Sequence, residues 1–235
     1  MTFHVVTIFP EFFREPFRFG VVGKALADGR VGLQVHDLRS WAYDRHRTVD
    51  DRPFGGGEGM LVKPEPVFQA VETIFPQRAP ERQRVVLLSA QGARFDQGAA
   101  RRLVGFEEVL LICGRYEGVD ERVAEHLADE ELSIGDFVLS GGEWAAAVVI
   151  DATIRLVPGV VGNEQSTLAE SFSEPGMLDC PHYTRPADFR GFNVPEGLLG
   201  GNHAAIAAWR RRAAWAKTAR LRPDLLAAEG PDERK

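Results

Sequence analysis

The sequence predicts an α/β domain with a mostly parallel sheet, followed by a small C-terminal helical domain. Short apolar runs that resemble strands alternate with helical stretches through the first two-thirds of the chain. This alternation is typical of strand–helix–strand units in a parallel sheet. Three of the predicted strands end in glycine-containing turns, and beyond residue 161 the chain becomes polar and then rich in arginine.

The first elements follow from local composition. Residues 3–8 are predicted to form a buried strand, and residues 10–27 a helix that begins at a proline and ends before Gly29. Residues 31–36 alternate apolar and polar positions, which predicts a second strand. Residues 40–60 have no sustained period and form a long polar loop, and such loops in compact domains are usually functional or disordered.

The next elements complete two strand–helix units. A helix is expected at residues 64–75, ended by Pro76, and a short buried strand at residues 85–88, followed by a turn at residues 89–92. Asp96 is a suitable N-cap for a helix over residues 96–103. A further buried strand is expected at residues 109–113.

The remaining elements define the predicted domains. Helices are expected at residues 120–127 and 143–156, and Pro158 with Gly159 closes the first domain. We therefore predict one domain over residues 1–161, a flexible polar linker over residues 162–176, and a second domain over residues 177–235. That second domain contains a long helix over residues 202–226.

Composition narrows the class of protein. The chain has 235 residues, 44% of them hydrophobic, and a net charge of −6, which argues against a uniformly basic nucleic-acid binder. Residues 182–222, however, carry a net charge of +6, almost entirely from arginine, which suits phosphate and base recognition. The two cysteines are far apart, and neither a signal peptide nor a membrane-length apolar run is evident, so we expect a cytoplasmic protein.

The common nucleotide and hydrolase motifs are missing. The sequence contains no G-x-x-x-x-G-K-[ST], no G-x-G-x-x-G after the first strand, and no H-E-x-x-H, C-x-x-C or G-x-S-x-G. What remains is three turns at the carboxyl ends of predicted strands, at residues 89–92, 114–118 and 135–142. Ligands of open α/β sheets bind at such strand ends. Backbone groups there suit an uncharged adenosine-like ligand better than a polyphosphate.

Five segments resemble those of the bacterial tRNA (guanine-N1)-methyltransferases of the SPOUT class. They are residues 44–53 (DRHRTVDDRP), 55–60 (GGGEGM), 113–120 (CGRYEGVD), 133–143 (SIGDFVLSGGE) and 178–186 (LDCPHYTRP). The resemblance extends over essentially the whole chain. It implies methyl transfer from S-adenosylmethionine to N1 of guanosine 37, next to the tRNA anticodon, with a preference for a preceding guanosine.

The resemblance also implies a structure and partners. The first domain should contain a deep trefoil knot, an exception to the rule that chains do not thread loops. The enzyme should be a homodimer with active sites at the interface, and its C-terminal domain should bind the anticodon stem-loop of tRNA. The family uses Mg²⁺, but no residues with metal-ligand spacing are apparent, so no metal ligand is assigned.

The resemblance assigns the cofactor-binding role to the glycine-rich turns and the residues beside them. These are Leu88, Ser89, Ala90, Gly114, Tyr116, Glu117, Gly118, Ile134, Gly135, Asp136, Phe137, Val138, Leu139, Gly141 and Gly142. Phe137 stands where many relatives have tyrosine.

Two residues are assigned to catalysis through the same resemblance. Guanine N1 is protonated at neutral pH, so a base must remove its proton. The family places an aspartate in the linker, and Glu170 occupies that position here, one methylene longer. Arg155 matches an arginine that should stabilise negative charge on guanine O6.

Contacts with the substrate are expected from the polar loop and from the strongest C-terminal motif. The predicted residues are Asp50, Gly55, Gly56, Gly57, Gly59, Asp179, His182 and Arg185. His46 is equally compatible with a ligand-binding role and with an ordinary loop position.

Two alternatives stay open from the sequence. One is an RNA methyltransferase of the same class that acts elsewhere, for example on a ribose hydroxyl. The other is a tRNA-binding module without catalytic activity, which would bind tRNA and not the cofactor.

Overall fold

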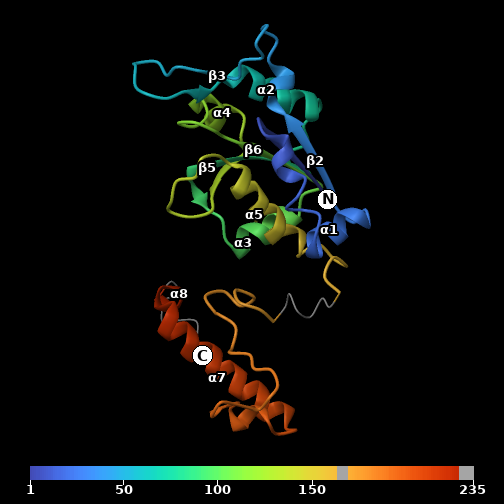
Figure 1. Ribbon diagram of the computed structural model, residues 1–235, viewed down its shortest axis with the longest axis vertical. Helices are drawn as coiled ribbons and strands as arrows, with labels where there is room; N and C mark the ends of the chain where they lie inside the picture. The colour runs from blue at the N-terminus through green and yellow to red at the C-terminus, as the bar shows by residue number, and fades with distance from the viewer. Residues whose placement is uncertain (163–168, 228–235) are drawn as a thin grey trace. The chain divides into compact units, whose positions relative to one another are not determined.

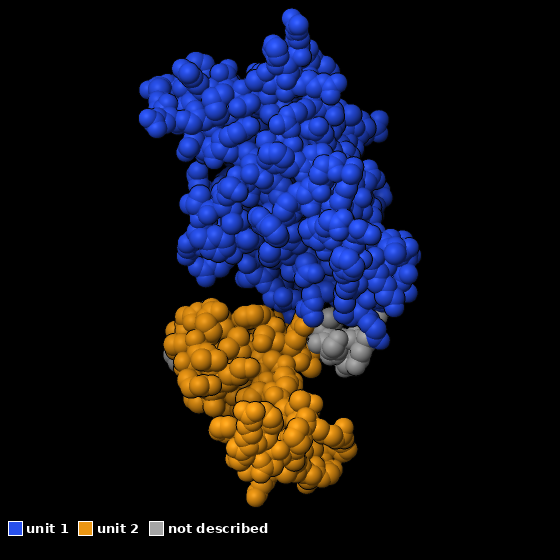
Figure 2. Space-filling model, in the orientation of Figure 1, with its two compact units in different colours: residues 1–162 blue, residues 163–235 orange. Residues whose placement is uncertain are grey.

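The computed structural model of the chain describes residues 1–162 and 169–227. Contacts divide the chain into two compact units, Met1–Gly162 (unit 1) and Asn163–Lys235 (unit 2), coloured separately in Figure 2. Residues 163–168 of the predicted linker and residues 228–235 of the predicted second domain lie outside the described residues.

Unit 1 is built on a five-stranded sheet in which every neighbouring pair is parallel. The strand order is β2-β1-β6-β5-β7. The strands are β1 (Thr2–Thr7), β2 (Gly32–Asp37), β5 (Gln83–Arg94), β6 (Glu108–Cys113) and β7 (Glu130–Ser133). The predicted α/β fold with a parallel sheet is confirmed. Because β5, β6 and β7 are neighbours, their carboxyl ends meet at one edge.

Helices cover both faces of this sheet, as Figure 1 shows. The helices α1 (Gly20–Ala27), α3 (Gln97–Val104) and α5 (Glu143–Ile154) pack on one face, and α2 (Pro64–Ile74) and α4 (Glu121–His126) on the other. Successive strand residues point to opposite faces. In β6, Leu111 joins the α5 side, whereas Leu110 and Ile112 join the α2 side. Burial on both faces explains why the central strand β6 is a continuous apolar run after Glu108.

The predicted helix over residues 10–27 is wrong in its first half. The structure has a short 3₁₀ helix, η1 (Pro10–Phe13), then turns, and only then α1. Pro16 lacks the N–H that a continuous helix would use. Gly20, at the start of α1, has a φ of 68°, which differs from helical backbone.

The predicted turn at residues 89–92 is also wrong, because these residues belong to β5. The register of β5 against β7 shifts between Leu88 and Ala93. A Cβ on Gly92 would lie 2.5 Å from the backbone of Glu131 and Leu132. This glycine therefore marks a close approach of two strands instead of a turn.

The long polar loop contains short ordered elements. They are η2 (Leu38–Trp41) and a small antiparallel pair, β3 (Asp50–Asp51) with β4 (Leu61–Val62). The pairing of Asp50 with Val62 closes the intervening glycine-rich segment into a loop whose two ends are held together.

The described residues of unit 2, 169–227, form a hairpin of β8 (Asp188–Phe189) and β9 (Phe192–Asn193), the short η3 (Glu196–Leu198), and two helices. The predicted helix over residues 202–226 is divided into α7 (His203–Leu221) and α8 (Pro223–Ala227). The Asn202 side chain accepts from the N–H groups of Ala204 and Ala205, which caps α7. Within residues 1–162 and 169–227, no helix combines the length and apolar character needed to cross a membrane.

Candidate active site

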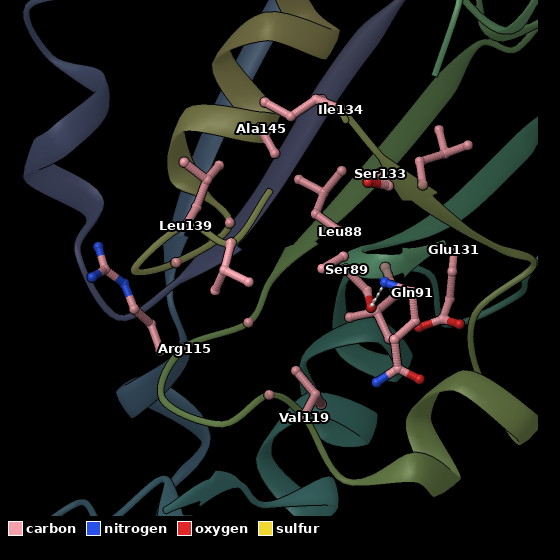
Figure 3. Close-up of a pocket in the computed structure, with 18 of the residues that line it drawn as sticks. Leu88, Ser89, Gln91, Arg115, Val119, Glu131, Ser133, Ile134, Leu139 and Ala145 are labelled. Atoms are coloured by element: carbon pink, nitrogen blue, oxygen red, sulfur yellow. Dashed lines mark hydrogen bonds between the residues drawn. The ribbon is translucent and has the colours of Figure 1, made fainter. Parts of the chain in front are cut away.

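A pocket opens where β6 and β7 end, beside the part of β5 where its register against β7 shifts, and Figure 3 shows it. Residues from all three strands and from the start of α5 line it. Of the residues predicted to bind the cofactor, the lining includes Leu88, Ser89, Ala90, Gly114, Tyr116, Glu117, Gly118, Ile134, Gly135, Phe137, Val138, Leu139, Gly141 and Gly142. Asp136 is not among the lining residues, and its carboxylate pairs with Arg94 (Oδ2 to Nη2, 3.1 Å) on the surface.

Two glycine-rich segments of the pocket are joined by their backbones. We call residues 114–118 the β6 loop and residues 135–142 the β7 loop. The Gly142 N–H donates to the Gly114 carbonyl (2.9 Å), and Arg115 forms an antiparallel bridge with Gly141. A Cβ on Gly142 would lie 2.8 Å from the Cys113 Cα. The two loops therefore approach more closely than most side chains would allow.

The β6 loop also pairs with the end of the polar loop. The Glu117 N–H donates to the Met60 carbonyl (3.0 Å), and the Val62 N–H to the Gly118 carbonyl (3.0 Å). This contact places the glycine-rich segment of residues 55–59 beside the pocket. Its predicted substrate residues are all exposed glycines with positive φ: Gly55, Gly56, Gly57 and Gly59. Asp50 is half-buried on β3.

Arg115 connects the β6 loop to a buried acid. Its Nε donates to Oε1 of Glu143 (3.3 Å), and its Nη2 lies 2.9 Å from Oε2. Glu143 begins α5, and its side chain is 1% exposed. Burial and then the Glu143 charge raise the pKa of the neighbouring Cys113 thiol well above its usual range, so this thiol stays protonated.

The two predicted catalytic residues lie in different units. Arg155 is half-buried at the C-terminal end of α5 in unit 1. Glu170 is half-buried in unit 2, where its N–H donates to Ser173 Oγ (3.0 Å) and its carbonyl accepts from the Ser173 N–H (3.0 Å).

The segment after Glu170 is fastened to α7. The Thr218 hydroxyl, which is fully buried, accepts from the Leu178 N–H (3.0 Å) and donates to the Ala214 carbonyl (2.8 Å). The Asp179 N–H donates to Ser171 Oγ (3.1 Å). The long helix thus holds the segment that carries Glu170 and Asp179 in a defined conformation.

Three potential metal ligands meet in this segment, although the sequence analysis assigned two of them, Asp179 and His182, to substrate contacts and none to a metal. One ligand atom each of Asp179, Cys180 and His182 lies within 4.8 Å of the others. Burial alone would raise the pKa of Asp179, but hydrogen bonds from His182 (2.7 Å) and the Cys180 N–H lower it overall. The predicted substrate residue Arg185 follows on the exposed surface.

The sequence reasoning also missed several lining residues: Leu87, Gln91, Arg115, Val119, Glu121, Ala124, Glu131, Leu132, Ser133 and Ala145. Gln91 lies inside the segment 89–92 that was expected at the ligand, but only Ser89 and Ala90 of that segment were assigned to the cofactor. Glu131 lies on β7, ahead of the glycine-rich segment on which the assignment was based. Arg115 lies inside the segment 113–120 that resembles the family, and this position between assigned cofactor residues was the one signal that could have identified it. Its partner is 28 positions away, so local pattern could not reveal the pair.

Comparison with known proteins places the chain in a family. A sequence model of the tRNA (Guanine-1)-methyltransferase TrmD family matches residues 1–228. The chain belongs to this family. A tRNA (guanine-N(1)-)-methyltransferase of Koribacter versatilis (strain Ellin345) is 52% identical in an alignment that covers 96% of this chain and 92% of that protein. A protein of the same name from Methylococcus capsulatus (strain ATCC 33009 / NCIMB 11132 / Bath) is 54% identical, with 97% and 90% covered.

The family implies S-adenosylmethionine, and the pocket fits it. Several glycines of the β6 and β7 loops line it together with apolar side chains such as Leu88, Ile134 and Leu139, as expected of a site for a mostly uncharged ligand. Mg²⁺ does not fit the group of Asp179, Cys180 and His182. That ion requires oxygen ligands in octahedral geometry, and a thiol and an imidazole do not suit it. No step of the reaction is assigned to a metal.

Proposed function

We propose that the chain transfers a methyl group from S-adenosylmethionine to N1 of guanosine 37 in tRNA, preferring a preceding guanosine. The observation that carries this proposal is membership of the tRNA (guanine-N1)-methyltransferase family together with the glycine-lined pocket at the strand ends. S-adenosylmethionine, when bound, supplies an electrophilic methyl group on a sulfonium. A tRNA substrate implies a cytoplasmic location.

The β6 and β7 loops bind the cofactor in this proposal. Backbone groups of Gly114, Ile134 and Leu139 recognise the uncharged adenosine, for which a lysine-rich site is unnecessary. Tyr116 and Phe137, which are 50% and 54% exposed, offer aromatic surface at the rim. Relatives' knotted fold is expected here also, with these loops as part of the knot.

Glu170 acts as the base. Its carboxylate accepts the proton from guanine N1, which leaves the ring nitrogen with the electron pair that forms the new bond. Negative charge then spreads to O6, and the Arg155 guanidinium stabilises it. The target base must leave its stack first, at a cost of a few kcal/mol. Asp50 and the glycines of residues 55–59 contact that base or its neighbour.

The tRNA contacts the basic surface of unit 2. Arg210, Arg211, Arg212 and Arg220 are exposed on α7, and Arg185 lies exposed before the hairpin. Arginine forks pair with phosphate oxygens. Asp179 and His182 lie in the same segment as Glu170, which supports a role for them near the substrate.

A homodimer is part of the proposal. Large apolar side chains are exposed beside the pocket and along the start of α5: Phe137, Val138, Leu139, Trp144 and Val148, with Val138 88% exposed. Exposed apolar patches of this kind mark interaction surfaces. A second copy of the chain that covers this patch would place its own residues beside the pocket.

Mapping the methylated atom tests the function. Unmodified tRNA with guanosines at positions 36 and 37 is incubated with labelled S-adenosylmethionine, and the product nucleoside is identified. We expect 1-methylguanosine at position 37, slowed about 100-fold or more by Glu170→Gln. Glu174→Gln, an exposed acid of the same segment, is the matched control and stays near wild type. A methylated ribose, or tRNA binding without methylation, would support one of the two alternative functions instead.

A further inference from the structure

A closed circuit of contacts surrounds Glu143, where the end of β1 meets the pocket. The Thr7 hydroxyl donates to Glu143 Oε1 (2.6 Å) and accepts from the Phe9 N–H (3.0 Å). The Phe9 ring lies under the Arg115 guanidinium (4.5 Å to the ring centre), and Arg115 returns to Glu143. Thr7 is fully buried and the Arg115 side chain is 22% exposed. The circuit joins parts of the chain that are 136 positions apart.

Arg115 also spans the two glycine-rich loops. It belongs to the β6 loop, and its Nη1 donates to the Ser140 carbonyl in the β7 loop (3.1 Å). A Cβ on Gly141 would lie 2.2 Å from Arg115 Nε. The glycine therefore leaves the space that the guanidinium occupies. Figure 3 shows Arg115 at the edge of the pocket, on the side of Leu139 and away from Gln91.

We propose that Glu143 is a positioning residue for cofactor binding, because it holds Arg115 as a bracket that fixes the distance between the β6 and β7 loops. This inference rests on the proposed function, since it concerns the same pocket. Glu143 is buried and lies behind Arg115, so it acts through that side chain.

The charge on Glu143 is what makes the bracket rigid. Oε1 of Glu143 accepts the hydrogen bond from Arg115 Nε, whereas Oε2 lies 2.9 Å from Nη2 as an ion-pair contact without hydrogen-bond geometry. The guanidinium has no acceptor of its own, so the negative charge of the carboxylate is what holds it there. Glutamine has nearly the same shape but only one acceptor oxygen and no charge. In Glu143→Gln the Nε and Nη2 groups would share that oxygen or face the amide N–H₂. Arg115 would then lose its fixed orientation toward Ser140.

Two measurements on the full-length protein test the inference. Calorimetry with S-adenosylmethionine is expected to give a Kd for Glu143→Gln that is weaker by about tenfold or more, because the charge that holds the Arg115 guanidinium is lost. Amide hydrogen exchange without any ligand is expected to be faster in both loops, residues 114–118 and 135–142. The exchange experiment does not depend on the cofactor, so it tests the bracket even if the wild-type protein binds no S-adenosylmethionine.

A second buried ion pair provides the matched control. Asp129 pairs with Arg78 in unit 1, with both side chains mostly buried, and accepts from the Val85 N–H (2.7 Å). It does not line the pocket. Both Glu143→Gln and Asp129→Asn break a buried ion pair and should lower the melting temperature. Asp129→Asn should nevertheless leave the Kd for S-adenosylmethionine within about twofold and the exchange of the two loops unchanged.

The inference is overturned if Glu143→Gln leaves both the Kd and the loop exchange at wild-type values. It is equally overturned if Asp129→Asn weakens the cofactor to the same extent, because the effect would then be general loss of stability. Should Glu143→Gln not fold, Arg115→Lys replaces it. A lysine keeps the charge beside Glu143 but cannot reach Glu143 and the Ser140 carbonyl together. Faster exchange in both loops is therefore expected again. Unchanged exchange would contradict the role of Arg115 in holding the two loops together.

Discussion

Some positions around the pocket require glycine because neighbouring atoms occupy the space where a Cβ would lie. Gly142 has an ordinary helical φ of −75°, so its backbone conformation would permit any residue. A Cβ there would nevertheless meet the Cys113 backbone at 2.8 Å, in a strand that is buried on both faces. The need for glycine at this position therefore comes from the packing of two loops and not from the turn itself.

Gly142→Ala should thus be destabilising and should weaken cofactor binding. Overpacking that forces a backbone shift costs about 1–3 kcal/mol. Chemical denaturation and calorimetry with S-adenosylmethionine measure the two effects. Gly162→Ala is the control, because a Cβ there meets nothing within 4 Å and φ is not positive. Equal stabilities of the two variants would show that the loops can separate without cost.

Two histidines make the residues of β1 and β2 sensitive to acid. His4 Nδ1 lies 3.1 Å from His36 Nε2, and His4 Nε2 lies 3.2 Å from Glu108 Oε1. Burial lowers the pKa of His4 below its usual range, although Glu108 acts in the opposite direction. Burial and then the charge of His4 lower the pKa of His36.

Stability should therefore fall as the pH decreases below about 6.5, the usual histidine pKa. In that range the unfolded chain binds more protons than the folded protein, so the free energy of unfolding rises with pH. The rise ends above about pH 6.5, where these histidines are neutral in both states. Denaturation between pH 5 and pH 8 measures this slope. His36→Gln should reduce it, whereas His126→Gln, at an exposed position, should not. An identical slope in His36→Gln would exclude this pair as its source.

At the scale of elements, four of the five strands could be predicted from sequence because each has an apolar run or an alternating pattern, whereas no range was predicted for β7, which contains two glutamates. β6 is the clearest example, since all of Val109–Cys113 is buried and every one of these residues is apolar. The first predicted helix failed at Pro16, and β5 was predicted too short because Gly92 was interpreted as a turn residue. A proline can begin a helix or interrupt one, and a glycine can form a turn or allow two strands to approach closely. Contacts between residues distant in sequence decide which occurs.

The contact between α7 and the segment of Glu170 is an element-scale feature that can be broken selectively. Thr218→Val keeps the shape of the buried side chain but removes the acceptor of the half-buried Leu178 N–H. An unsatisfied buried group costs about 1–3 kcal/mol. We expect lower stability and slower methyl transfer, because the segment that carries Glu170 loses its anchor. Thr218→Ser retains the hydroxyl and should restore most of both, and a Ser variant as impaired as the Val variant would contradict the role of this hydrogen bond.

At the scale of the whole molecule, charge is distributed unevenly along the chain, which the net charge of −6 does not show. The acidic surplus lies mainly in unit 1, while residues 182–222 carry the arginines that we assign to tRNA. The sequence could predict this asymmetry, since it is a matter of composition. It could not predict the circuit of Thr7, Arg115 and Glu143, whose members come from three separate parts of the chain.

Binding of tRNA should accordingly depend steeply on salt. Each phosphate contact that is lost reduces the slope of log Kd against log salt concentration by about 1. The double variant Arg211→Gln, Arg212→Gln should therefore bind less tightly and with a shallower slope. Replacement of Arg14 and Arg18, exposed arginines of unit 1 that pair with Glu11 and Glu15, serves as the charge-matched control. Equal slopes of log Kd against log salt concentration for the two double variants would show that α7 does not contact phosphate.

Hydrogen exchange of the full-length protein with and without S-adenosylmethionine tests the central claim most directly. The claim is that β5 and the ends of β6 and β7 together form the cofactor site. We predict that saturating S-adenosylmethionine slows amide exchange at residues 88–90, 114–118 and 134–142, with little change in α7. Protection confined to other segments, or no protection at a concentration that supports methyl transfer, would contradict the assignment of this pocket.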